Sequence, residues 1–177
     1  TIDGIEHVNI IDEFIHQERI STDNLIEICK LKRANYKVIA TFGDPAGSAV
    51  QSVAGMGDIE RFRRVGMNVR FVRDKISRKL EAGISHVRSF IENAEGLRRL
   101  HVDRKCLGIA EDLENYRYPD HKEGMALKEL PVKDGYHDHG CDMVRYFLLN
   151  RFPIKQQGIK FVDRNKKEQK WHQHKIL

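Results

Sequence analysis

The most informative segment of this sequence is Tyr136-His137-Asp138-His139-Gly140-Cys141-Asp142-Met143-Val144-Arg145-Tyr146-Phe147. It opens with side chains that can bind a metal ion and continues with apolar residues at helical spacing. This pattern predicts a helix from about Asp138 to Asn150 that buries one face. His139 and Asp142 are three residues apart in its first turn, so both lie on the same side of the helix.

The polar residues of this segment allow two interpretations. Oxygen ligands at a helix N-terminus beside an imidazole suit a hard divalent cation such as Mg²⁺ or Mn²⁺, and the helix dipole also favours a carboxylate there. Alternatively, Asp138 caps the helix, Asp142 is a solvated acid of the first turn and His139 is a surface histidine. Taken by itself, the segment favours neither interpretation.

A second acid, Asp44, follows an apolar run. Residues 37–43 are predicted to form a short buried strand, and Asp44-Pro45-Ala46-Gly47-Ser48 ends it at its carboxyl end. Open α/β sheets bind their ligands at that end, which makes Asp44 another candidate metal ligand. An aspartate before a proline is also a common turn residue, and that simpler role remains open.

Strands and helices are predicted to alternate along the chain. The run from His7 to His16 is typical of a central strand, and Asp3-Gly4 before it of a hairpin turn. Further strands are expected at residues 68–72 and 99–102. Two helices are expected to be capped by Ser21 or Thr22 and by Asp58, and two more to begin near Ile76 and near Lys105. The order β-α-β-α-β-α-β-α indicates an α/β fold with partly parallel strands, and the hairpin indicates a mixed sheet.

Two further regions differ in composition from this pattern. Residues 116–132 contain prolines and a glycine around an alternating stretch, which predicts a protruding hairpin or flap before the last helix. Residues 155–177 are basic and lack apolar periodicity. We therefore expect one folded domain at residues 1–154 and a basic C-terminal tail at 155–177.

Composition limits the class of protein further. At 177 residues and 40% hydrophobic, the chain can bury one substantial core. Its net charge of +5 is compatible with a polyanionic partner. Three widely separated cysteines show no zinc-site spacing and predict reduced thiols in a cytosolic setting. The sequence contains no signal-peptide pattern, no apolar run long enough to cross a bilayer and no GxxxxGK[ST] phosphate loop.

Together these features resemble the C-terminal nuclease domain of the large terminase subunit of tailed bacteriophages, a member of the RNase H-like group. The resemblance runs from about His7 to Phe147. It is carried by four segments: Asn9-Ile-Ile-Asp-Glu-Phe14, Gly43-Asp44-Pro45-Ala46, Tyr116-Arg117-Tyr118 and Asp138-His139-Gly140-Cys141-Asp142-Met143-Val144-Arg145-Tyr146. It implies an RNase H-like mixed central sheet with helices on both faces.

The function implied by this resemblance is that of a metal-dependent endonuclease. Such a domain cuts concatemeric double-stranded viral DNA at the start and end of genome packaging, with Mg²⁺ or Mn²⁺ in a two-metal site. Implied partners are double-stranded DNA, a terminase ATPase domain in the full-length chain, the portal and the small terminase subunit. The implied location is the host cytoplasm, at the packaging motor on the procapsid.

The resemblance assigns roles to three residues. Asp44 matches the second acid of the family, Asp142 the late acid on the final helix, and His139 the histidine one turn before it. All three are expected to be catalytic and to bind metal. The family's first catalytic aspartate lies on a first strand that this chain is expected to lack.

Lysines of the predicted flap are candidate DNA contacts: Lys122, Lys128 and Lys133. Ordinary solvated lysines are an equally good interpretation. Two other functions remain open. The first is a catalytically silent domain that grips DNA or docks on the motor through an incomplete acidic site. The second, which fits the final helix less well, is a junction resolvase of the same group.

Overall fold

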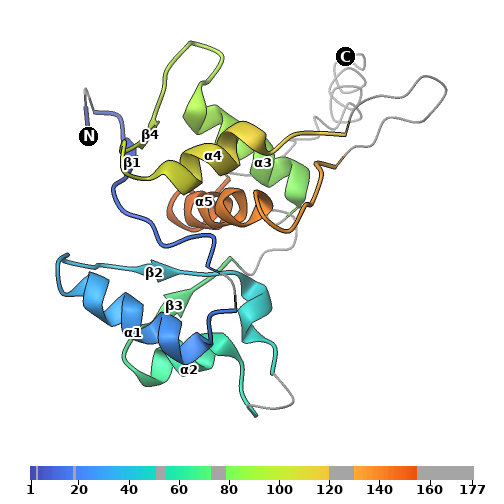
Figure 1. The fold of residues 1–177 in the computed structure, drawn as a ribbon. Helices are drawn as coiled ribbons and strands as arrows, with labels where there is room; N and C mark the ends of the chain where they lie inside the picture. The colour runs from blue at the N-terminus through green and yellow to red at the C-terminus, as the bar shows by residue number, and fades with distance from the viewer. Residues whose placement is uncertain (3, 18, 51–54, 73–78, 120–129, 155–177) are drawn as a thin grey trace, which may run out of the picture.

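The structure is a computed structural model that describes residues 1–2, 4–17, 19–50, 55–72, 79–119 and 130–154 (Figure 1). In chain order its elements are β1 (Val8–Ile10), α1 (Thr22–Arg33), β2 (Thr41–Phe42), the short 3₁₀ helix η1 (Pro45–Ser48), α2 (Asp58–Arg64), β3 (Val69–Arg70), α3 (Leu80–Ile91), β4 (Leu100–Val102), α4 (Leu107–Asn115) and α5 (Asp138–Arg151). The predicted alternation of strands and helices is confirmed. The helix predicted at residues 138–150 is observed with one more residue at its end.

The strands pair in two small parallel sheets. β1 pairs with β4, with Val8 opposite Leu100, and β2 pairs with β3, with Thr41 opposite Val69. Parallel pairing agrees with the predicted α/β class. The single mixed central sheet predicted from the sequence is not observed. The described residues form two separate two-stranded sheets instead. The strand predicted at residues 37–43 is short because its first half is uncovered: the Ile39 side chain is 84% exposed.

The N-terminal turn is present but joins neither sheet. Ile2 and Ile5 exchange both backbone hydrogen bonds, at 3.0 and 2.9 Å, around a left-handed Gly4 with φ +77°. A glycine adopts this φ without steric penalty. The pair is an isolated antiparallel bridge, so the expected hairpin does not make either sheet mixed.

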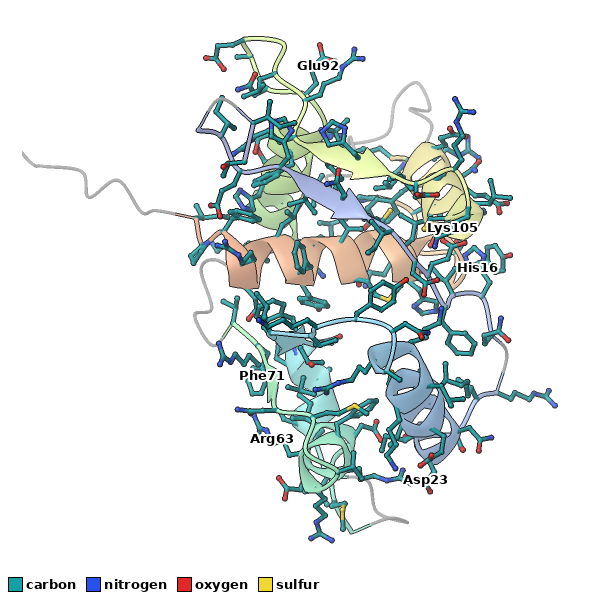
Figure 2. All side chains as sticks on the ribbon, turned by 90° about the vertical axis from the view of Figure 1, so that its left-hand side faces the viewer. His16, Asp23, Arg63, Phe71, Glu92 and Lys105 are labelled. Carbon is teal, nitrogen blue, oxygen red and sulfur yellow. The ribbon has the colours of Figure 1, made fainter. Side chains whose placement is uncertain are left out.

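Helix α5 lies across the middle of the molecule and separates two layers (Figures 1 and 2). It packs against α3 and α4 on one side and approaches β2 on the other. The buried core on the first side consists of Val8, Val87, Phe90, Ile109, Val144 and Leu148. On the second side the rings of Phe147 and Phe42 meet edge to face at 5.8 Å. Helix α5 therefore has apolar contacts in both directions.

Two of the predicted helix caps differ in the structure. Ser21 caps α1 as expected, accepting the N–H of Asn24 at 3.2 Å. The cap of α2 is Gly57 rather than Asp58, and a Cβ at Gly57 would lie 2.8 Å from the Ala49 carbonyl oxygen. Similarly, α5 is capped by His137, and Asp138 is its first, buried residue, so the interpretation of Asp138 as the cap is wrong.

Several expectations fall outside the described residues. The predicted flap at 116–132 is described only at its two ends, where the Val132 N–H donates to the Arg117 carbonyl at 2.9 Å. The predicted start of α3 near Ile76 and the basic tail at 155–177 also lie outside the described ranges.

The central position of α5 makes its buried residues the most sensitive to truncation. Leu148 is 0% exposed, so Leu148→Ala should lower the free energy of unfolding by about 2–5 kcal/mol through lost packing and a new cavity. Met143 lies on the same helix but is 48% exposed, and Met143→Ala should change that free energy by only about 0.5 kcal/mol. Urea unfolding measures both; equal effects would contradict this packing.

Candidate active site

A cleft of about 1410 Å³ lies along one side of α5. Its walls come from β1 and the segment that follows it, from α1, from the segment leading through β2 to Asp44, and from the first three turns of α5. All three residues assigned from the sequence line this cleft, namely Asp44, His139 and Asp142. The fold thus brings residues from distant parts of the chain to one surface.

Asp44 lies directly after β2 and has a structural role of its own. Its Oδ1 accepts the backbone N–H of Ala46 at 2.8 Å and caps η1. The simpler interpretation of Asp44 as a turn residue is therefore correct. It does not exclude the other, because the side chain is exposed and Oδ2 has no hydrogen-bond partner among the described residues.

Asp142 is held by the arginine one turn further along α5. Its Oδ1 accepts from Arg145 Nη2 at 2.8 Å and from Nε at 3.2 Å. Burial disfavours the charge of Arg145, but the hydrogen bonds and negative charge of Asp142, together with Tyr146, outweigh burial and raise the pKa of its guanidinium. The guanidinium also lies 4.3 Å from the ring centroid of Tyr146. Oδ1 of Asp142 is thus fixed, and Oδ2 makes no hydrogen bond to another described residue.

The pKa of the Tyr146 hydroxyl depends on the charges of both Asp44 and Asp142. Burial is the main cause of its raised pKa, and the negative charges of Asp44 and Asp142 both add to the effect. Both carboxylates therefore act on the same phenol, which stays protonated near neutral pH. Tyr146 also lines the cleft.

The candidate ligand atoms are of the kind that a hard cation binds, but too few of them lie close together. Asp44 and Asp142 offer carboxylate oxygens, and the His139 ring makes no hydrogen bond to another described residue. Within the described ranges, however, no three His, Cys, Asp or Glu side chains lie close enough together to hold one metal ion.

Two further acids of the cleft are already engaged. The oxygens of Glu13 accept the backbone N–H groups of Gly108 and Ile109, both at 2.9 Å, and so cap the start of α4. Asp12 accepts from Lys32 at 2.8 Å, and this hydrogen bond lowers the pKa of Asp12. Neither acid is free to replace the first carboxylate of a metal site.

Sequence reasoning missed a buried polar pair beside the cleft. Asp112 of α4 is 0% exposed; its Oδ2 accepts the Gly140 N–H and its Oδ1 pairs with His16 Nε2, each at 2.8 Å. Tyr136 stacks on the His16 ring with centroids 4.0 Å apart. No local pattern marks Asp112, because it occurs among the surface acids of an ordinary amphipathic helix.

The cations near the cleft are also different from those expected. Lys133 is exposed and does not line the cleft, while Lys122 and Lys128 lie outside the described residues. Lining cations instead come from the end of α1 and the residues after it: Lys32, Arg33 and Lys37. Nη1 of Arg33 is buried and has no hydrogen-bond partner among the residues that the structure describes.

Comparison of the chain with models of protein families, with curated proteins and with solved structures gave no match. Among the described residues no helix has the length and apolar character needed to span a membrane.

The contact between Gly140 and Asp112 gives a direct test of the site's construction. Alanine normally stabilises a helix relative to glycine, but a Cβ at position 140 would overlap the Asp112 carboxylate and lie 2.8 Å from Ile15 Cδ1. Gly140→Ala should therefore lower the free energy of unfolding by about 1–3 kcal/mol. Ser85→Ala, at an exposed position of α3, is the control. A stabilised Gly140→Ala variant in thermal unfolding would contradict the observed contact.

Proposed function

We propose that this chain is the nuclease domain of a viral genome-packaging terminase, which hydrolyses phosphodiester bonds of double-stranded DNA with a divalent cation. One observation carries the proposal: Asp44, His139 and Asp142, assigned from the sequence by resemblance, line a single cleft although Asp44 is far in the chain from the other two. Their oxygen and imidazole donors suit Mg²⁺ or Mn²⁺.

Each residue of the cleft has a role that its contacts allow. Asp44 and Asp142 would hold the cation through their unbonded carboxylate oxygens, and Arg145 fixes the side chain of Asp142. When bound, the cation supplies an activated water and stabilises the leaving oxygen. His139 completes the ligand set or carries a proton. The protonated hydroxyl of Tyr146 can donate a hydrogen bond to a phosphate oxygen.

The DNA backbone would be held by the cations that line the cleft. Arg33 and Lys37 lie where α1 ends and the chain leads toward β2. Arg33 is partly exposed, and a guanidinium can donate two parallel hydrogen bonds to one phosphate group. Lys133 remains a candidate for an outer contact because it is exposed.

A silent DNA-gripping or motor-docking domain is the second candidate. It is favoured by the absence of a three-ligand cluster in the described ranges and by the engagement of Asp12 and Glu13 elsewhere. This alternative predicts binding of DNA through the same cleft without cleavage. Activity measurements on this chain separate the two candidates.

Removal of the Asp142 charge tests the endonuclease. Asp142→Asn keeps an oxygen that can accept from Arg145, so the fold should be retained, while the loss of charge weakens a cation ligand. Nicking of supercoiled plasmid in Mn²⁺ should fall to background, and Asp44→Ala should have the same effect. Glu114→Gln, at an exposed acid of α4, is the matched control. Nicking by Asp142→Asn at the rate of the unaltered chain would refute the assignment.

Removal of a cleft cation tests the DNA contact. Arg33→Ala should weaken binding of a DNA duplex and reduce the slope of log Kd against log salt by about 1, since each phosphate contact releases roughly one counterion. Lys30, on the same helix, does not line the cleft, so Lys30→Ala should change the slope far less. Fluorescence anisotropy in EDTA gives both values; equal slopes would place the DNA elsewhere.

A further inference from the structure

His16 occupies an unusual backbone conformation beside the cleft. Its φ of +57° is in the left-handed region, which is uncommon for residues other than glycine and unfavourable unless the surroundings enforce it. Two contacts enforce it here, the 2.8 Å pair with Asp112 and the stacked ring of Tyr136. The side chain is 13% exposed and lines the cleft, on the segment leading from β1 to α1 (Figure 2).

The Asp112 carboxylate fixes the tautomer of His16. One of its oxygens accepts the Gly140 N–H, and the other faces His16 Nε2. A carboxylate can only accept, so Nε2 must carry a hydrogen. In the neutral ring the lone pair is then on Nδ1, which makes no hydrogen bond to another described residue. The arrangement leaves a basic nitrogen oriented by a fully buried acid.

Asp112 also places this ring beside the proposed site. The carboxylate contacts both His16 and Gly140, the residue next to His139 at the start of α5. His16, His139 and Asp142 all line the same cleft, so His16 borders the space that a substrate would enter. No role was predicted for His16 from the sequence.

We infer that His16 is a general base of this cleft and that Asp112 is its positioning residue, an inference that rests on the proposed function. In the step, a water O–H bond breaks and its proton goes to His16 Nδ1 while the water oxygen bonds to phosphorus. The bond from phosphorus to the leaving sugar oxygen breaks, and that oxygen keeps the electron pair and takes a proton from solvent. Asp112 stabilises the imidazolium that forms.

The charges around the ring support this role. From α4 the ring faces Asp112, and from the segment before α5 it faces Tyr136. Beyond Tyr136 is His137, whose pKa is raised by its hydrogen bond with Asp134.

Further ionisable groups near the ring lie on α5, on α1 and on the segment that carries His16 itself. The pKa of the Cys141 thiol on α5 is raised to about 12 by burial, so the thiol stays neutral. On α1, Lys32 lines the cleft and is paired with Asp12. Glu13, earlier on the same segment as His16, is bound to the start of α4. The fixed negative charge nearest the ring is Asp112.

The decisive variant is His16→Gln. A glutamine amide can still donate to Asp112, so melting temperature and DNA affinity should be retained, but it cannot accept a proton near neutral pH. The rate of Mn²⁺-dependent plasmid nicking should fall by roughly 100-fold, and the acidic limb of its pH profile should disappear. A His16→Gly variant suits the positive φ, and added imidazole should restore part of its nicking.

The outcomes separate the two claims. If the unaltered chain nicks and His16→Gln nicks at the same rate with the same pH profile, the inference is wrong and the proposed function stands. If the unaltered chain does not nick, both are overturned. A long-range ¹H–¹⁵N spectrum, with the ring assigned from its loss in His16→Gln, adds a readout independent of activity. It should show neutral His16 protonated on Nε2; protonation on Nδ1 would overturn the inference.

Discussion

The fully buried Asp112 carboxylate is the interaction on which the geometry of the cleft depends. It accepts the backbone N–H of Gly140 at the start of α5 and pairs with His16, 96 residues earlier in the chain. A buried charge of this kind is unfavourable unless its hydrogen-bond partners are all present. The same requirement therefore fixes the first turn of α5, which carries His139 and Asp142, against the segment that follows β1.

Packing of helix α5 on both sides holds its residues in place at the wall of the cleft. Its core-facing residues, such as Val144 and Leu148, pack against α3, α4 and β1, while Phe147 contacts Phe42 across the cleft. Arg145 lies between the two regions, buried yet charged because Asp142 pairs with it. A helix packed on both sides cannot rotate without losing one set of contacts, so Asp142 has a fixed position relative to Asp44.

Local patterns in the sequence were sufficient for part of this structure. Helical periodicity predicted α5 and the order of the elements, and the turn after an apolar run predicted the position of Asp44. Two features had no local signal, because their partners are distant: Glu13 caps α4 from 95 residues away, and Asp112 holds His16. The number of sheets was missed for a related reason, since strand pairing depends on which apolar runs are covered in the folded chain.

We propose that Asp44 and Asp142 together hold a divalent cation in the cleft. Paramagnetic broadening of backbone amide signals by substoichiometric Mn²⁺ is the first measurement to make, because the effect falls steeply with distance from the ion. We expect selective broadening at residues 43–46 and 139–143, lost in the Asp142→Asn variant. Broadening centred elsewhere, or unchanged in that variant, would contradict it.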